Sequence, residues 1–178
     1  ILLVGGGEGM GPLEETAWAI ASAGLSLCLV VVTGRNQKLK ARLEAQQWPV
    51  PTFIYGFVYQ MPEFMQAADI LVTKAGPGTI SEAFIAGLPL ILYSRLPGQE
   101  DGNVTYVTEH GAGIWAPRAD LIVNAVRQWL LHPESHAQAA AACRRLARPQ
   151  ASRQIAHILM QYLNQKAASG TLLIPELL

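Results

Sequence analysis

The chain has 178 residues, of which 51% are hydrophobic and 15% are charged, and its formal net charge is zero. A chain of this length is expected to form one domain of ordinary size with its own core. The high apolar fraction is typical of a parallel sheet that helices cover on both faces. Because there is no basic excess, the composition excludes nucleic acid as a partner.

Short apolar segments alternate with helix-forming segments along the chain. The expected strands cover residues 1–4, 27–32, 52–55, 70–73, 90–93 and 114–116. A helix is expected after each of them, and the chain is expected to stay helical to about residue 165. Six such β–α units predict an α/β fold with a doubly wound, six-stranded parallel sheet of the Rossmann-like type. Residues 1–165 are expected to form this domain, with residues 166–178 as a loose tail or a segment that packs on a missing partner.

Residues 16–34 carry no charge, and this length approaches that of a membrane-spanning helix. The Ala23-Gly24 pair interrupts the segment, which is alanine-rich before it and rich in Leu and Val after it. We therefore expect a helix followed by a buried strand, with Cys28 in the core. The two cysteines form no CxxC motif, which agrees with a reducing compartment.

The loop Gly5-Gly6-Gly7-Glu8-Gly9-Met10-Gly11-Pro12 follows the first strand. It differs from a dinucleotide-binding fingerprint because Met10 stands where the third glycine is required, and no acid ends the second strand. What is left is a glycine loop that permits close backbone approach to a ligand. Glu8 is expected either to orient a substrate hydroxyl or to be a solvated loop acid.

The segment Thr73–Ala83 predicts a strand, a tight Gly/Pro turn and the N-terminus of a helix. Such a terminus offers backbone N–H groups and a positive dipole end to an anion, and Gly76–Thr79 would supply them. Glu82 lies one helical turn further on, where its carboxylate could hold two ribose hydroxyls. The alternative is structural, because Thr79 and Glu82 also fit a capping box.

Charged and aromatic residues end the neighbouring strands. Arg35 and Lys74 are each expected either to balance a diphosphate or to pair with Glu8 or Glu82. Backbone amides at Gly56–Val58 could read a base edge, and Phe57 would be either an apolar wall or a core residue.

The loop after the fifth strand, Leu96–Asn103, is dense in hydrogen-bonding groups. Gln99 and Glu100 are suited to sugar hydroxyls, or the loop is simply polar surface. The sequence contains no HExxH, no DxD and no His/Cys cluster at ligand spacing, so neither a metal nor a cofactor is predicted.

Taken together, these loops resemble the donor-binding half of a GT-B glycosyltransferase, and in particular the monogalactosyldiacylglycerol synthase family, which is related to the peptidoglycan N-acetylglucosaminyltransferase. The resemblance covers about residues 1–130. Its most specific motifs are GGGEGMGP at 5–12, TKAGPGTI at 73–80 and PGQExGN at 97–103.

The resemblance implies a UDP-galactose donor, with the 76–79 turn on the diphosphate, Glu82 on the ribose, the 56–58 backbone on the uracil, and Gln99 and Glu100 on the hexose. It implies inverting galactosyl transfer to diacylglycerol without a metal. The expected UDP-sugar-binding residues are Gly7, Arg35, Phe57, Val58, Lys74, Gly76, Pro77, Gly78, Thr79, Glu82, Gln99, Glu100 and Asn103.

A complete enzyme of this family has an N-terminal domain that supplies the acceptor site and the catalytic base, and we expect that domain to be missing here. The chain itself is expected to be soluble, and the full-length protein to associate with the cytoplasmic side of a membrane surface. Three alternatives stay open: UDP-glucose or UDP-N-acetylglucosamine as the donor for another lipid acceptor, a stand-alone nucleotide-sugar-binding subunit, and a non-catalytic interaction domain.

Overall fold

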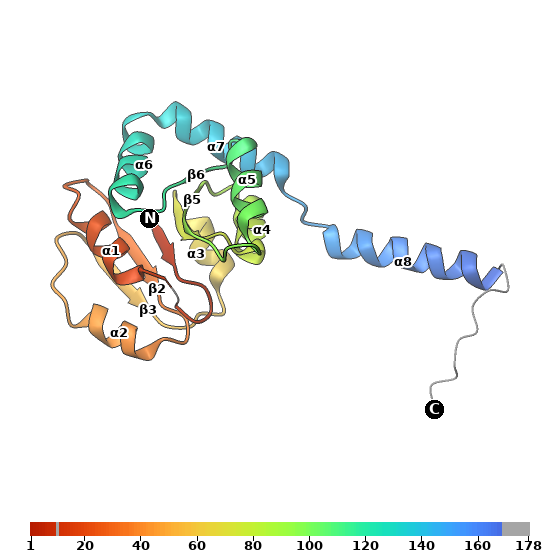
Figure 1. Cartoon of the computed structure of the whole chain (residues 1–178), viewed down its shortest axis with the longest axis horizontal. Coiled ribbons are helices and arrows are strands. Elements are labelled where there is room, and N and C mark those ends of the chain that lie inside the picture. Colours follow the sequence, from red (N-terminus) through yellow and green to blue (C-terminus); the bar gives the residue numbers. More distant parts are fainter. Residues whose placement is uncertain (10, 169–178) are drawn as a thin grey trace. The chain divides into compact units, whose positions relative to one another are not determined.

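The computed structural model describes residues 1–9 and 11–168 (Figure 1). Residues Ile1–Ala147 form one compact unit, and a second unit begins at Arg148. The limit expected at residue 165 lies within a helix of this second unit, and the rest of the expected tail, residues 169–178, lies outside the described residues.

A parallel sheet forms the centre of the first unit. Its six strands lie in the order β3-β2-β1-β4-β5-β6, and every neighbouring pair is parallel. This order confirms the doubly wound, Rossmann-like fold, with its topological switch point between β1 and β4. The strands are β1 Leu2–Val4, β2 Leu29–Val32, β3 Thr52–Tyr55, β4 Leu71–Lys74, β5 Leu90–Ser94 and β6 Gly113–Trp115.

Helices connect the strands and cover both faces of the sheet (Figure 1). They are α1 Leu13–Ala21, α2 Gln37–Glu44, α3 Met61–Ala67, α4 Pro77–Ala86, α5 Asp101–Glu109, α6 Ala119–Leu131 and α7 Pro133–Leu146. The helical region expected after the sixth strand is thus divided, because Pro133 starts a new helix and cannot continue the preceding one.

Alternation along the strands sends successive side chains to opposite faces of the sheet. Leu3 packs in one buried cluster with residues of α1, α2 and α6, whereas Leu2 and Val4 pack in a second cluster with residues of α3, α4 and α5. Both faces are therefore apolar, as the composition predicts.

The expectation that Cys28 lies in the core is wrong. Strand β2 begins at Leu29, and the segment before it alternates between half-buried and exposed side chains, with Cys28 on the exposed side. Residues 25–28 therefore do not belong to the buried strand, although most of them are apolar. Cys143, in contrast, is fully buried in the second cluster.

The second unit contains α8, Ala151–Ala168. Its large apolar side chains are exposed within the described residues, and they include Ile155, Ile158, Leu159, Tyr162 and Leu163. Among the described helices, none combines the length and apolar character that crossing a membrane requires.

Candidate functional site

A pocket of about 280 Å³ lies beyond the carboxyl ends of the strands, on both sides of the switch point. The loops after β1, β2 and β3 line it together with the first turn of α3 and the first two turns of α4. The lining residues are Val4, Gly6, Gly7, Val32, Gly34, Phe57, Val58, Met61, Thr79 and Glu82.

The glycine loop after β1 packs against the turn after β2. Gly34 has a φ of +60°, and a Cβ at this position would lie 2.3 Å from the carbonyl oxygen of Gly7. Gly9 also has a φ of +60°, and its Cβ would lie 2.2 Å from the carbonyl oxygen of Thr33. Neither position admits a side chain, so these two glycines serve the contact between the loops, while Gly6 and Gly7 line the pocket.

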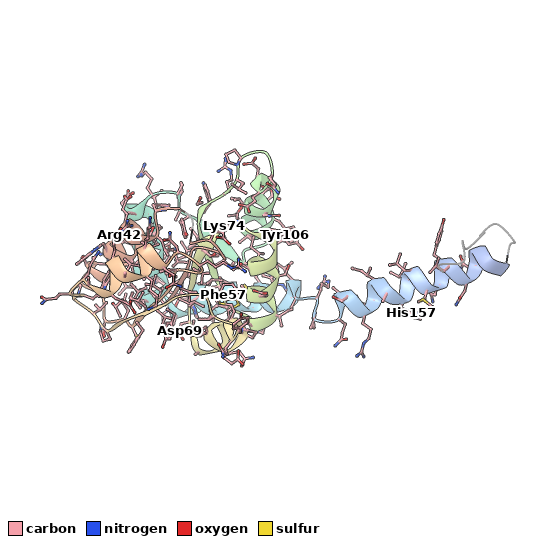
Figure 2. The ribbon with its side chains drawn as sticks, turned by 90° about the horizontal axis from the view of Figure 1, so that it is seen from below. Arg42, Phe57, Asp69, Lys74, Tyr106 and His157 are labelled. Carbon is pink, nitrogen blue, oxygen red and sulfur yellow. The ribbon has the colours of Figure 1, made fainter. Side chains whose placement is uncertain are left out.

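Phe57, which Figure 2 labels, lines one wall of the pocket, and Arg35 lies over its ring. The guanidinium carbon of Arg35 lies 4.7 Å from the centre of the Phe57 ring, and its Nη1 donates to Glu8 Oε1 at 2.8 Å. Phe57 is 43% exposed and lines the pocket, so it is not a core residue. Of the two roles considered for Arg35, the structure contains the ion pair with Glu8.

Helix α4 directs its N-terminus towards the same end of the sheet. Gly76 is its N-cap, Pro77 is its first residue, and the first intrahelical bond runs from the N–H of Ile80 to the carbonyl of Gly76. The amides of Gly78 and Thr79 precede that bond, so the helix itself provides no acceptor for them.

The capping-box interpretation of Thr79 and Glu82 is wrong, because the N-cap is Gly76 and no side chain caps this helix. Glu82 is exposed and lines the pocket from the second turn of α4. Its position is therefore not explained by a local structural role, which leaves its carboxylate available to a ligand.

An ion pair connects the end of β4 with the loop after β5. Lys74 Nζ lies 2.7 Å from Glu100 Oε1, and the backbone N–H of Leu96 donates to Glu100 Oε2 at 2.8 Å. Asn103 Nδ2 donates to the carbonyl oxygen of Ala75 at 2.8 Å. Glu100 is only 4% exposed, so these contacts occupy a carboxylate that the sequence had suggested for a sugar.

The loop after β5 has a second internal support at Asp101, the first residue of α5. The backbone N–H of Gly98 donates to one carboxylate oxygen and Arg95 donates to the other. The Gly98 hydrogen bond and then the Arg95 hydrogen bond lower the pKa of Asp101. This loop presents Gln99 on its exposed surface.

Nine of the thirteen predicted residues thus fall into two groups. Gly7, Phe57, Val58, Thr79 and Glu82 line one pocket. Lys74, Gly76, Glu100 and Asn103 surround the N-terminus of α4, where the Lys74–Glu100 pair and the Asn103–Ala75 hydrogen bond hold the turn.

Five residues that line the pocket were not selected from the sequence, namely Val4, Gly6, Val32, Gly34 and Met61. Gly6 belongs to the glycine loop at residues 5–12 that the sequence indicated. Met61 follows the loop after β3, and only its position close to a strand end could have indicated a role. Within the described ranges, no three His, Cys, Asp or Glu side chains are grouped so as to hold a metal ion.

The fold and this pocket define a doubly wound α/β domain with a candidate ligand site at its topological switch point. Residues 1–156 match the family model of the glycosyltransferase family 28 C-terminal domain. The chain therefore belongs to the family of glycosyltransferase family 28 C-terminal domains.

Curated relatives confirm the resemblance to monogalactosyldiacylglycerol synthases. The chain is 43% identical to a probable chloroplastic monogalactosyldiacylglycerol synthase of Nicotiana tabacum, over 93% of this chain and 32% of that protein. It is 40% identical to chloroplastic monogalactosyldiacylglycerol synthase 1 of Arabidopsis thaliana, over 93% of this chain and 33% of that protein. The chain thus spans about a third of the length of these relatives.

Solved structures show the same fold. The MurG structure of Acinetobacter baumannii aligns with a TM-score of 0.70 at 19% identity, over 90% of this chain and 49% of that one. A UDP co-structure of S. aureus MnaA aligns with a TM-score of 0.69 at 16% identity, over 92% of this chain and 45% of that one.

Proposed function

We propose that this chain binds the UDP-sugar donor of a glycosyltransferase in the pocket at the switch point. One observation carries the proposal. The Glu82 carboxylate, the Phe57–Val58 wall and Thr79 near the N-terminus of α4 line a single pocket of about 280 Å³. This volume is close to the lower end of the range for small-molecule sites, about 300–1,000 Å³.

Each part of the donor has a matching part of the site. The uracil would lie at Phe57 and Val58 and be read by the 56–58 backbone, and the ribose hydroxyls would bind Glu82. The diphosphate would lie at the 76–79 turn, next to Lys74, with the hexose extending towards Gln99. This order supports the proposal, because a carboxylate suits a pair of hydroxyls and a helix N-terminus suits an anion.

The chemistry that follows is the stabilisation of a leaving group. In glycosyl transfer from a UDP-sugar the bond between the anomeric carbon and the diphosphate oxygen breaks, and negative charge develops on the UDP. Backbone amides and the positive end of the α4 dipole are fixed before the reaction and interact most strongly with that charge. Lys74 adds a cation at the same end of the helix.

For the longer protein we propose inverting galactosyl transfer to diacylglycerol, which yields monogalactosyldiacylglycerol. The names of the relatives support this choice. The catalytic base and the acceptor site would come from a domain outside this chain, as would most of the contact with the membrane surface. UDP-glucose or UDP-N-acetylglucosamine with another lipid acceptor, and a stand-alone donor-binding subunit, are the alternatives.

The substitution Glu82→Gln tests the ribose contact. We expect it to weaken UDP binding about tenfold, because hydrogen bonds to a charged group are worth about 1.5–3 kcal/mol. Binding of 2′,3′-dideoxy-UDP, which lacks both hydroxyls, should be weak and should not change with the substitution. Glu109→Gln is the matched control, since Glu109 is an exposed glutamate that does not line the pocket. Equal losses for UDP and its dideoxy analogue would contradict the ribose assignment.

A further inference from the structure

Lys74 is held at a defined place beside the N-terminus of α4. Between Thr73 and Lys74 the register of β4 against β5 shifts, so that Ser94 lies opposite Lys74. The side chain then runs beside the glycine loop and ends at the helix: a Cβ built on Gly6 would lie 3.3 Å from Lys74 Cε, and one built on Gly76 would lie 3.4 Å from Lys74 Nζ. Irregularities of this kind often re-aim a side chain next to a binding site.

Glu100 fixes the ammonium group from the other side. Its two oxygens have separate tasks, because Oε1 accepts from Lys74 Nζ at 2.7 Å and Oε2 accepts from the N–H of Leu96 at 2.8 Å. The side chain of Glu100 is 6% exposed, whereas that of Lys74 is 27% exposed. The carboxylate is therefore nearly closed to a ligand, and the ammonium is the accessible member of the pair.

From this arrangement we infer that Glu100 is a positioning residue, which holds the Lys74 ammonium against the diphosphate of the donor and does not itself contact the hexose. The inference rests on the proposed function. An ammonium group has three donors, so the bond to Glu100 leaves two for phosphate oxygens. Lysine has a long flexible side chain, and fixing it before the ligand arrives reduces the entropy lost on binding. Within the Gln99–Glu100 pair, the exposed Gln99 would then read the hexose.

The same turn has a second support that does not involve charge. Asn103 Nδ2 donates to the carbonyl of Ala75, and the N–H of Ala75 donates to the carbonyl of Ser94 at 2.8 Å. The backbone at the start of α4 is thus held independently of Glu100. For this reason a change at Glu100 should act on the Lys74 side chain more than on the helix N-terminus.

Two other roles for Glu100 predict different results. If Glu100 contacted the hexose, its replacement would weaken binding of UDP-galactose and leave UDP unchanged. If it only neutralised Lys74, its replacement would remove a negative charge near the phosphates, and UDP would bind more tightly.

The test is calorimetric titration of the 178-residue chain and its variants with uridine, UDP and UDP-galactose. The variants are Glu100→Gln, Lys74→Met, the double variant and the control Glu109→Gln. We expect Glu100→Gln and Lys74→Met each to weaken the binding of UDP and the binding of UDP-galactose by the same factor, about tenfold. Uridine, which lacks phosphates, should bind every variant within about twofold of the wild type, as expected where no charged contact is lost. The double variant should bind UDP no more weakly than Lys74→Met, because the two residues act as one unit.

Three results would each overturn the inference. They are a loss of affinity for UDP-galactose alone, tighter binding of UDP by Glu100→Gln, and additive losses of UDP affinity in the double variant. Should Glu100→Gln not fold, Glu100→Asp replaces it. The aspartate keeps the charge but places it one methylene further from Lys74. If Glu100 positions Lys74, this variant should bind UDP more weakly, and unchanged UDP binding would overturn the inference. A folded wild-type chain that binds no UDP would instead refute the proposed function.

Discussion

The hydroxyl of Thr73 donates a hydrogen bond of 3.1 Å to the carbonyl oxygen of Val4, and so joins the ends of β4 and β1 at the switch point. Both residues are buried, and the hydroxyl of Tyr93 also donates to this carbonyl, at 3.4 Å. The floor of the proposed donor site is therefore built from hydrogen bonds that water does not reach.

Replacing Thr73 by valine should destabilise the chain without closing the pocket. Valine has nearly the same shape but no hydroxyl, so the Val4 carbonyl loses the side-chain hydrogen bond from Thr73 and keeps the longer one from Tyr93. We expect a loss of about 1 kcal/mol in the free energy of unfolding, typical of one buried hydrogen bond. Urea denaturation measures this loss, and a variant as stable as the wild type would show that the bond contributes nothing.

Gly34→Ala should disrupt the contact between the first two loops. Its Cβ would lie 2.3 Å from the carbonyl oxygen of Gly7 at a φ of +60°, so we expect a loss of about 2 kcal/mol or more. Gly102→Ala is the matched control, because Gly102 lies in α5 and a Cβ there meets nothing within 4 Å. In thermal unfolding, the melting temperature of Gly34→Ala should be well below that of the control. Equal melting temperatures would contradict the proposed loop contact.

Gly78→Ala should separate stability from binding. A Cβ at Gly78 meets open space in the unliganded protein, and alanine is favoured over glycine within a helix by about 0.5–1 kcal/mol. If the diphosphate lies against the 78–79 amides, however, the added methyl group occupies part of its place. We expect a variant that is as stable as the wild type or more so, with weaker UDP binding. Undiminished UDP affinity would argue against this position of the phosphates.

How much of this could be predicted from the sequence depends on the kind of signal. The six β–α units were predictable because apolar segments alternate with helix-forming segments and glycine turns separate them. These signals are local in the sequence. The approach of Gly7, Phe57 and Glu82 to one pocket was also predictable, since each follows the carboxyl end of a parallel strand.

The partners of charged residues were not predictable in the same way. The sequence suggested Glu100 for a sugar or for polar surface. In the structure its carboxylate pairs with Lys74, which follows a shift in register between β4 and β5. Cys28 was misassigned for a related reason. Burial depends on whether the sheet has begun, and the length of an apolar segment does not determine that point.

The two cysteines should react differently with an alkylating reagent. Cys28 is exposed, whereas Cys143 is buried, and burial raises the pKa of its thiol to about 12. In the native chain at pH 8, mass spectrometry should therefore find one label, on Cys28, and in urea it should find two. Equal labelling of Cys143 in the native chain would contradict its position in the core.

Stability should fall as the pH rises from about 9 towards 12. The ordinary pKa of the Cys143 thiol is 9.0 and burial raises it, so above pH 9 the unfolded chain loses a proton that the folded chain retains. Tyr93 acts in the same direction, because burial raises its pKa above the ordinary 10.0. Cys143→Ala should reduce the slope of unfolding free energy against pH in this range. A slope that stays the same would show that the thiol does not carry it.

The chain should bind a UDP-sugar donor at the switch point without a metal. Calorimetric titration of the folded chain with UDP, UDP-galactose and UDP-glucose, in the presence of a chelator, tests this most directly. We predict saturable binding of one UDP per chain, with the preferred sugar nucleotide identifying the donor. The absence of saturable UDP binding to the folded chain would contradict the account.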